Sequence, residues 1–313
     1  MKNFNLSQKF KASVPLHIYQ HSADWGVLFY DDVYILAHYM KLCCLAEKYN
    51  IKVFGLCYML NHIHYLLASD SLDKLRLFMQ TLTSSFALEY NQYTGHHGSV
   101  FASPFGFAFK YKAKAFRSCH NYIANNAPEK RISKKAIDYK WNFLKYSKTA
   151  HPYSNPVLKK TCSKDLWELS KEIHTFHSQS KPMKLQRLVF IKNRLDKTEW
   201  LQFIDVLIST YNIIDFYSTA SAFDGGLDSM LTAPDYNTGS EYEFDEDSLN
   251  YLPFYQYLTI LSNRMKLCNF SPYALDKKQR IAFVQEMFRR THCTRHHLSL
   301  FFHLDESELI HLT

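Results

Sequence analysis

The chain of 313 residues has no apolar run long enough to span a bilayer, and its polar start is interrupted by Lys2, Lys9 and Lys11. A helix needs about 20 predominantly apolar residues to cross the hydrocarbon core, and a secretory signal needs an apolar segment of its own. These two absences predict a soluble protein with no membrane partner and a cytoplasmic location.

A disulfide framework and a nucleotide phosphate loop are also missing. The seven cysteines are an odd number without framework spacing, which favours reduced thiols in a cytosol. The adjacent Cys43 and Cys44 fall inside an apolar stretch at 33–49 and are expected in the core. No G-x-x-x-x-G-K-[ST] phosphate loop occurs, which agrees with a function that needs no ATP, and no internal repeat is evident.

Positive charge is concentrated in the first half of the chain. Residues 1–145 carry 18 Lys and Arg against 9 Asp and Glu, whereas the remainder carries 19 against 20. The excess is densest after Phe109, at Lys110, Lys112, Lys114, Arg117, Lys130, Arg131, Lys134 and Lys135. A basic zone of this kind predicts salt-sensitive phosphate binding, and we interpret these eight residues as DNA-binding, with a merely solvated face as the alternative.

Two histidines stand two residues apart in a strand-like context. Residues 51–60 are β-branched and aromatic, Asn61 breaks the run, and residues 63–67 resume it, which predicts a β-hairpin. Side chains alternate along a strand, so His62 and His64 share one face. Neutral imidazoles suit a divalent ion with open positions for a substrate oxygen. In a chain with 16 histidines, one core and one exposed histidine is the alternative.

A helix about sixty residues later carries a tyrosine and an amide on one stripe. Tyr122 and Asn126 are four residues apart, so the phenol and the amide face the same way. Asn125, Asn126 and Pro128 are helix-ending signals, which place both groups near the helix C-terminus. A neighbouring stripe of apolar residues predicts the buried side, at Phe116, Cys119, Ile123 and Ala127.

These segments occur in an order that resembles the single-tyrosine HUH transposases, specifically the REP-associated tyrosine transposase group. The resemblance runs from His17 to Tyr146, a little under half the chain. It is carried by the segments H-I-Y at 17–19, L-F-Y-D-D at 28–32, Y-M-L-N-H-I-H-Y-L-L at 58–67, F-M-Q at 78–80, Y-N at 90–91, G-S-V-F at 98–101, Y-I-A-N-N-A-P at 122–128 and Y-K-W-N at 139–142.

The resemblance implies a metal-dependent enzyme that cleaves and rejoins DNA. Tyr122 is the implied nucleophile, which would form a 5′-phosphotyrosine link to single-stranded or hairpin DNA. His62, His64 and Asn126 are the implied ligands of Mg²⁺ or Mn²⁺. No ATP is needed, because the covalent link conserves the phosphodiester energy. Two cooperating protomers, as in a homodimer, would allow strand transfer with one tyrosine each.

Two positions depart from the family pattern. The family has N-P directly after Y-I-x-x, whereas Ala127 separates Asn126 from Pro128 here. This leaves Asn125 as a rival third ligand, and Asn126 is preferred because the resembling enzymes place the polar ligand four residues after the tyrosine. The Arg-Gly that commonly follows the first strand is replaced by Gln20-His21.

The pattern predicts an α+β fold for residues 1–146, with antiparallel or mixed strands and helices on their faces, similar to ferredoxin-like folds. The expected order is a strand at 14–20, a helix at 33–49, strands at 51–60 and 63–67, a helix at 72–93 capped by Ser71, a strand at 100–110 and the Tyr122 helix. Along the last strand the aromatic residues alternate and are expected mostly in the core, with one or two available to stack on unpaired bases.

The second half is predicted to be helical. Residues 147–165 form an expected linker, and residues 166–313 an all-α region with helices at 166–176, 182–196 and 198–211. Residues 277–313, with helices at 277–291, 294–302 and 305–312, resemble a helix-turn-helix, and a small helical cap is an equal alternative. The acidic residues 241–247 are interpreted as a solvated turn rather than a metal site, and Cys293 with His296 and His297 lacks the remaining ligand pair of a zinc site.

Three functions are consistent with these features. The leading one is a transposase, the second is a domesticated hairpin-processing nickase with the same chemistry, and the third is a non-catalytic DNA-binding regulator that uses the C-terminal helices.

Overall fold

A computed structural model describes residues 10–23, 26–102, 105–236, 257, 260–261, 263–265, 275–291 and 293–312 of the chain. The acidic stretch at 241–247, interpreted above as a solvated turn, lies outside the described residues.

One antiparallel sheet of four strands lies at the centre of the first half. The strand order is β2-β3-β1-β4, with β1 at Leu16–His21, β2 at Lys52–Tyr58, β3 at His62–Ala68 and β4 at Gly106–Phe109. The predicted hairpin is confirmed, because β2 and β3 pair antiparallel and the Met59 amide donates to the His62 carbonyl at 2.8 Å. The two central strands, β3 and β1, therefore carry the H-x-H pair and the first histidines of the chain.

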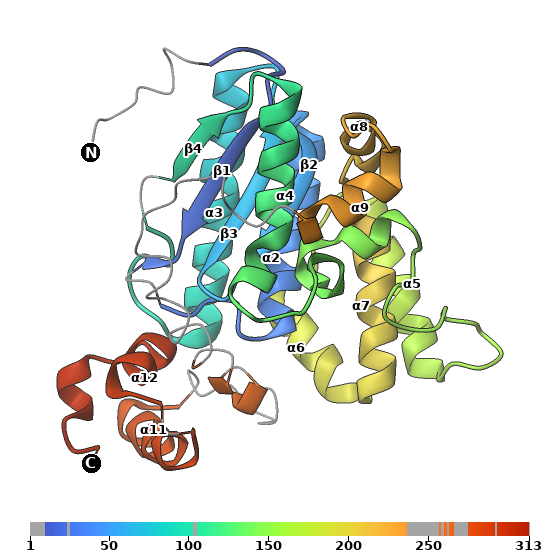
Figure 1. The fold of residues 1–313 in the computed structure, drawn as a ribbon. Helices are drawn as coiled ribbons and strands as arrows, with labels where there is room; N and C mark the ends of the chain where they lie inside the picture. Colours follow the sequence, from blue (N-terminus) through green and yellow to red (C-terminus); the bar gives the residue numbers. More distant parts are fainter. Residues whose placement is uncertain are drawn as a thin grey trace.

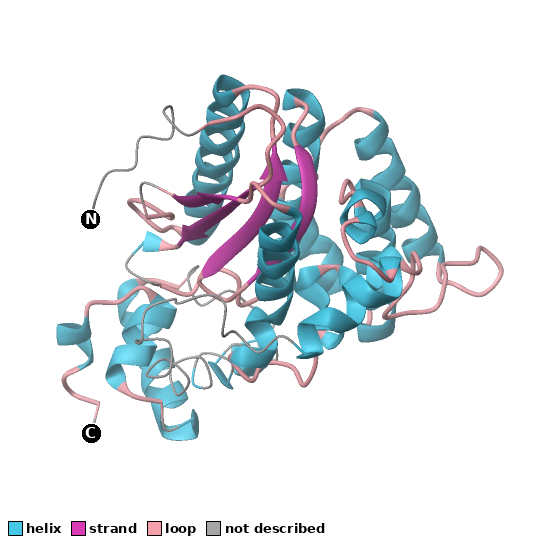
Figure 2. Ribbon diagram, turned by 45° about the horizontal axis from the view of Figure 1, so that its top comes forward, coloured by secondary structure: helices cyan, strands magenta, loops and turns pink. Residues whose placement is uncertain are grey.

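Helices cover both faces of this sheet, giving the expected α+β architecture (Figure 1; Figure 2). Helices α2 (Asp32–Tyr49) and α3 (Leu72–Thr94) pack against one face, where alternate residues of β1 and β3 such as Ile18 and Tyr65 are buried. Helix α4 (Ala113–Glu129) lies on the opposite face, where its apolar stripe packs on β2 and β3. The predicted stripe at Phe116, Cys119, Ile123 and Ala127 is buried in this contact.

The helix boundaries follow local capping chemistry. The Asp31 side chain accepts from the Val33 amide at 3.1 Å, and the predicted Ser71 cap accepts from the Lys74 amide. Asn50 ends α2 in the left-handed region at φ 54°, which asparagine tolerates better than most residues. Helix α4 includes Pro128 and ends at Glu129, one residue beyond the proline that was expected to follow it.

The last strand is shorter than its aromatic alternation suggested. Regular pairing covers Gly106–Phe109, and Phe101 forms only an isolated bridge with Ser22. Pro104 has no N–H to donate, which disfavours a continuous ladder through 100–110. Phe107 and Phe109 pair with Ile18 and Leu16, so their side chains belong to the face that α2 and α3 cover.

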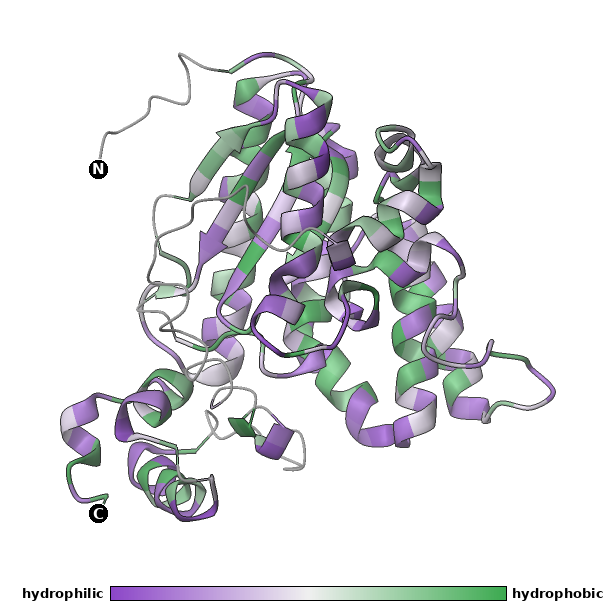
Figure 3. Ribbon diagram, in the orientation of Figure 1, coloured by the Kyte–Doolittle hydropathy of each residue, from purple (hydrophilic) through white to green (hydrophobic). Residues whose placement is uncertain are grey.

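Helices of the second half pack directly on the first. Helices α6 (Leu185–Arg194) and α7 (Lys197–Tyr211) contact α2, and α5 (Lys164–Ser178) contacts α7. One hydrophobic cluster contains residues from the sheet, from α2 and from α5 to α7. In Figure 3, helices α4 and α5 each carry hydrophilic and hydrophobic segments, as expected for helices with one buried side.

The expected linker is held by a buried carboxylate on α7. Asp205, fully buried, accepts from the Tyr146 hydroxyl at 2.7 Å, the Tyr153 amide at 3.0 Å and the Ser154 hydroxyl at 2.7 Å. Residues 148–163 form no helix or strand. The three hydrogen bonds fix its start against the helical region.

The segment after α7 packs against the β2 edge of the sheet and against α4. Ile214 forms a parallel bridge with Val53 of β2, and helices α8 (Phe216–Ser221) and α9 (Gly226–Tyr236) follow. Helix α9 packs on α4, and α8 packs on α9 and β2. No helix of the described chain is long and apolar enough to cross a bilayer.

The C-terminal helices lie together at one end of the molecule (Figure 1). Helix α11 (Lys277–Thr291) and helix α12 (Arg295–Phe302), capped by Thr294, match the expected positions. The segment 305–312 contains only the 3-10 helix Glu306–Leu309, so the acidic element expected as a third helix is a single turn. The Tyr30 and Phe301 ring centroids are 5.4 Å apart, which seats α12 on the first domain.

His38 of α2 leads to a prediction about stability and pH. Burial, followed by the charge of Lys41, lowers the pKa of this histidine to about 3. The unfolded chain takes up this proton near pH 6.5 but the folded chain does not, so the stabilising effect is complete above pH 6.5 and is lost as the pH falls below it. His38→Gln should reduce the slope of unfolding free energy against pH, between pH 6.5 and 5, by up to about 1.4 kcal/mol per pH unit.

Urea unfolding at a series of pH values measures this slope. His174→Gln, a change of an exposed histidine on α5, is the matched control and should leave the slope unaltered. An unchanged slope in His38→Gln would contradict the expected linkage.

Candidate active site

A row of imidazole rings lies on the sheet face that carries α4. His17, Tyr19 and His21 alternate along β1, and His62 and His64 alternate along β3. The strand register sets His21 opposite His62 and Tyr19 opposite His64. Ring centroids are 5.2 Å apart for His21 and His62, 4.9 Å for His62 and His64, and 5.1 Å for His17 and His64. The H-x-H pair is therefore part of a larger cluster built from both central strands.

Helix α4 brings the predicted tyrosine and amide to this cluster. The Tyr122 ring centroid lies 5.5 Å from that of His64 and 5.8 Å from that of His17. One turn further along α4, the Asn126 Oδ1 atom lies 3.2 Å from His64 Nε2. The histidine pair at His62 and His64 therefore lies beside Tyr122 and Asn126, although the two pairs are about sixty residues apart in the chain.

The orientation of the Asn126 amide follows from its second contact. Its Nδ2 group donates to the Tyr122 carbonyl at 2.9 Å, and a carbonyl oxygen can only accept. Oδ1 therefore faces His64, whose Nε2 must carry the proton that Oδ1 accepts. His64 Nδ1, 3.0 Å from His17 Nε2, is then the acceptor, so His17 carries its proton on Nε2. One chain of hydrogen bonds runs from β1 through β3 to α4.

Asn125, the rival third ligand, faces elsewhere. Its Nδ2 group donates to Glu129 Oε1 at 3.3 Å, along α4. Since Asn126 contacts His64 and Asn125 contacts Glu129, the geometry favours Asn126 for any role beside the histidines.

The residue before the H-x-H pair orients its first histidine. Asn61 is fully buried, and its Oδ1 atom accepts from His62 Nδ1 at 2.8 Å. The proton on Nδ1 leaves the lone pair of His62 on Nε2. A fixed outer contact of this kind commonly sets the tautomer of a metal-binding histidine.

The imidazoles of the H-x-H pair are held neutral. Burial lowers the pKa of His64 to about 3, and burial followed by the charge of His64 holds the pKa of His62 well below 6.5. The positive Lys130 lowers both further. Neutral imidazole nitrogens are the form that binds a metal ion, so no proton competes for these sites at neutral pH.

Tyr122 differs from the histidines, because it would have to lose its proton before it could react. Burial, followed by the charge of Glu129, raises the pKa of its phenol well above 10. The neutral phenol is a weak nucleophile, so attack on phosphorus would need a group that stabilises the phenolate. The side chain nevertheless remains partly exposed, unlike the fully buried tyrosines of the core.

Two of the eight predicted DNA-binding residues act directly on the histidine cluster. Lys110 follows β4 and its charge lowers the pKa of His17, while Lys130 follows α4 and lowers the pKa of His62 and His64. Both ammonium groups are partly buried, which lowers their own pKa. Positive charge from Lys110 and Lys130 therefore acts on both strands that carry the cluster.

The other six predicted basic residues lie further along α4 and beyond it. Lys112 and Lys114 are exposed where α4 begins, and Arg131, Lys134 and Lys135 are exposed beyond its end, about 25 Å away for a helix of 17 residues. The Arg117 guanidinium donates to the Ala222 carbonyl at 3.0 Å, and Lys135 pairs with Asp235 at 3.7 Å. The basic zone therefore forms two groups at opposite ends of α4.

The donor atoms of the cluster fit a divalent ion. His62 Nε2, His64 Nε2 and Asn126 Oδ1 would supply two imidazoles and an amide oxygen, provided that the His64 proton moves to its Nδ1 and the His17 proton moves from Nε2 to its own Nδ1, so that His17 Nε2 accepts from His64. Among the described residues, no group of three or more His, Cys, Asp or Glu side chains is arranged to hold a metal. The predicted site differs from such groups because its third donor is an amide.

Three members of the cluster were not predicted from the sequence as site residues. His17, Tyr19 and His21 occupy alternate positions of β1, and this period of two was the signal that would have placed them on one face.

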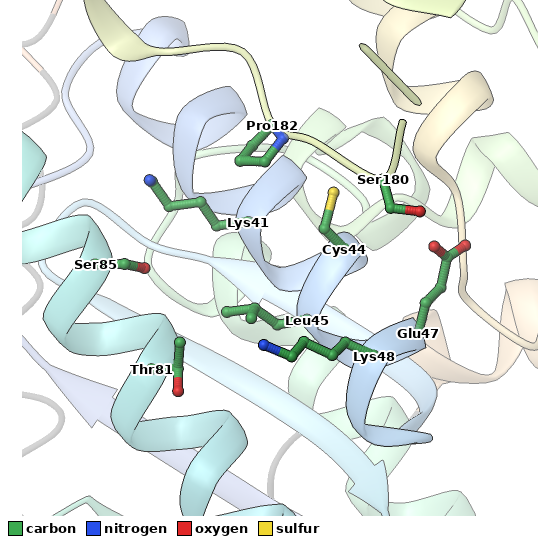
Figure 4. Close-up of a pocket in the computed structure, with 9 residues that line it drawn as sticks. All are labelled: Lys41, Cys44, Leu45, Glu47, Lys48, Thr81, Ser85, Ser180 and Pro182. Atoms are coloured by element: carbon green, nitrogen blue, oxygen red, sulfur yellow. The ribbon is translucent and has the colours of Figure 1, made fainter. Parts of the chain in front are cut away.

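A separate cavity of about 640 Å³ lies away from these residues. Lys41, Cys44 and Lys48 of α2 line it together with Thr81 and Ser85 of α3, on the other side of the sheet (Figure 4). None of the predicted site residues lines this cavity.

The hydrogen-bond chain predicts one tautomer for each histidine of the metal-free protein. His17 and His64 should carry the proton on Nε2, and His62 should carry it on Nδ1. Long-range ¹H–¹⁵N NMR at neutral pH identifies the protonated nitrogen of each histidine ring. Asn126→Ala should release His64 from the Nε2–H form, whereas Asn125→Ala should not. A His64 ring protonated on Nδ1 in the metal-free wild type would contradict the assignment.

Comparisons of the chain with protein-family models, with curated proteins and with solved structures give no match in any of the three.

Proposed function

We propose that the protein is a transposase-type HUH nuclease, which cleaves single-stranded or hairpin DNA through Tyr122 and rejoins the ends. In this proposal the β-α-β-β-α-β order of the first half is a ferredoxin-like nuclease domain, and His62, His64 and Asn126 hold Mg²⁺ or Mn²⁺. Strand transfer would use a homodimer, with one tyrosine from each protomer.

The observation that carries the proposal is the meeting of β3 and α4. A phenol and an amide from α4 face two neutral imidazoles of β3, with the Tyr122 ring centroid 5.5 Å from that of His64 and Asn126 Oδ1 3.2 Å from its Nε2. Packing alone does not account for a tyrosine beside buried, uncharged histidines and two partly buried lysines. These neighbours are the ones that a nucleophile needs if it acts beside a metal ion and a phosphate.

The proposed reaction is a phosphoryl transfer that conserves the phosphodiester. The Tyr122 oxygen loses its proton and bonds to phosphorus, the bond from phosphorus to O3′ breaks, and O3′ leaves as a hydroxyl after taking a proton. A bound divalent ion would polarise the phosphate and lower the energy of both oxyanions. Attack by a second 3′-hydroxyl reverses the step and restores the Tyr122 phenol. Lys110 and Lys130 would attract the phosphates on either side.

Covalent capture of DNA tests this reaction. With Mn²⁺ present, the wild-type protein should form a denaturant-stable adduct with a single strand labelled at its 3′ end, because the 5′-phosphate side stays on the tyrosine. A strand labelled at its 5′ end should be cut without labelling the protein. Tyr122→Phe should reduce the adduct below detection, since it removes only the attacking oxygen.

Tyr217→Phe is the matched control, because Tyr217 is 87% exposed on α8 and distant from the cluster in sequence. It should form the adduct at the wild-type rate. Failure of the wild type to form any adduct, or an undiminished adduct in Tyr122→Phe, would contradict the proposal.

Manganese affinity tests the third ligand. Asn126→Ala should weaken Mn²⁺ binding by about tenfold or more, since it removes a donor or its fixed contact with His64. Asn125→Ala should bind Mn²⁺ as the wild type does, because its side chain faces Glu129. Electron paramagnetic resonance of free Mn²⁺ gives both dissociation constants. Equal losses in the two variants would contradict the assignment of Asn126.

A further inference from the structure

We propose that the Tyr19 ring is the surface on which a base of the bound single strand stacks, next to the phosphate that is cut. This inference rests on the proposed function, and it assigns a DNA-binding residue that lies outside the basic zone. Three features of the Tyr19 ring support it: its position within the histidine cluster, its close contact with β4, and its partial exposure.

The Tyr19 ring lies flat across a glycine of the neighbouring strand. Tyr19 pairs with Gly106 in the register of β1 and β4. A Cβ atom added to Gly106 would lie 1.8 Å from Tyr19 Cζ and 2.3 Å from both Cε atoms. Only a residue without a side chain allows the ring this position. One face of the ring is therefore supported by backbone, and the other is turned away from the sheet.

This ring stands at the accessible side of the cluster. His17, His62 and His64 are at most 5% exposed, whereas Tyr19 and His21 are partly exposed. Helix α4 packs on β2 and β3, and Tyr19 lies on β1 beside the edge strand β4. A strand of DNA that reaches the buried histidines from this side passes the Tyr19 ring.

The surroundings of the ring suit a nucleotide. Its centroid is 5.8 Å from that of His17 and 5.7 Å from that of His21, so imidazoles flank it on both sides along β1. His17 in turn lies within the field of Lys110 and beside Tyr122. An aromatic ring beside a histidine that neighbours both a cation and Tyr122 matches how single-stranded DNA is held, by a stacked base and a neutralised phosphate.

Stacking and charge are separated by comparing two DNA strands of equal length. Oligo-thymidylate offers bases and phosphates, whereas an all-abasic strand offers phosphates alone. Fluorescence anisotropy measures both affinities in full-length proteins that also carry Tyr122→Phe, which prevents cleavage. Tyr19→Leu should weaken the affinity for oligo-thymidylate by roughly 5- to 150-fold, and the affinity for the abasic strand should not change.

Two further variants test the geometry. Gly106→Ala keeps Tyr19 but displaces its ring, so it should cause a similar selective loss, and combining it with Tyr19→Leu should add little. Tyr19→Phe keeps the ring and should bind both strands as the parent does. Tyr217→Leu, which removes an exposed tyrosine of α8, should also change neither affinity.

Several results would overturn the inference. They are an unchanged affinity for oligo-thymidylate in Tyr19→Leu, equal losses for the abasic strand, and a loss in Tyr19→Phe as large as that in Tyr19→Leu. The adduct assay is independent of these measurements. If the wild-type protein forms no adduct, the proposed chemistry is refuted. If the adduct forms normally but Tyr19→Leu does not weaken oligo-thymidylate binding selectively, only the Tyr19 assignment is refuted.

Discussion

The candidate site depends on one buried imidazole that joins three elements of the fold. His64 of β3 donates from Nε2 to Asn126 of α4 and accepts at Nδ1 from His17 of β1. Neither contact is possible unless the sheet has its observed register and α4 crosses it at Asn126. A buried polar ring is costly to leave without partners, so these hydrogen bonds also restrict where α4 can settle on β3. The position of Tyr122, one turn before Asn126, follows from that restriction.

Electrostatics gives this arrangement a consistent chemical character. Burial keeps the imidazoles neutral and raises the pKa of Tyr122, while Lys110 and Lys130 keep positive charge nearby. None of the site residues predicted from the sequence carries a negative charge, and Glu129, whose charge raises the pKa of Tyr122, accepts from Asn125. In the proposed function, the phosphodiester would supply the missing negative charge. The partly exposed Tyr19 and His21 lie at the accessible side of the cluster.

Short-range patterns in the sequence predicted the elements of the first half and the four residues that meet at the site. Alternation fixed the shared face of His62 and His64, and helical spacing fixed that of Tyr122 and Asn126. The strand at 100–110 was predicted too long, because alternation does not reveal where pairing stops. His17, Tyr19 and His21 joined the site through the pairing of β1 with β3, a long-range register that no local pattern contains. The choice between Asn125 and Asn126 likewise needed the direction of α4 over the sheet.

Identifying the residue that carries DNA is the most direct test of the account. After incubation with single-stranded DNA and Mn²⁺, nuclease and trypsin digestion leaves a nucleotide on one peptide, which mass spectrometry identifies. The peptide at 118–130 contains Tyr122 as its only tyrosine, so a nucleotide on this peptide is the predicted result. A nucleotide on the peptide at 12–41, which contains Tyr19, or on any other peptide would contradict the central claim.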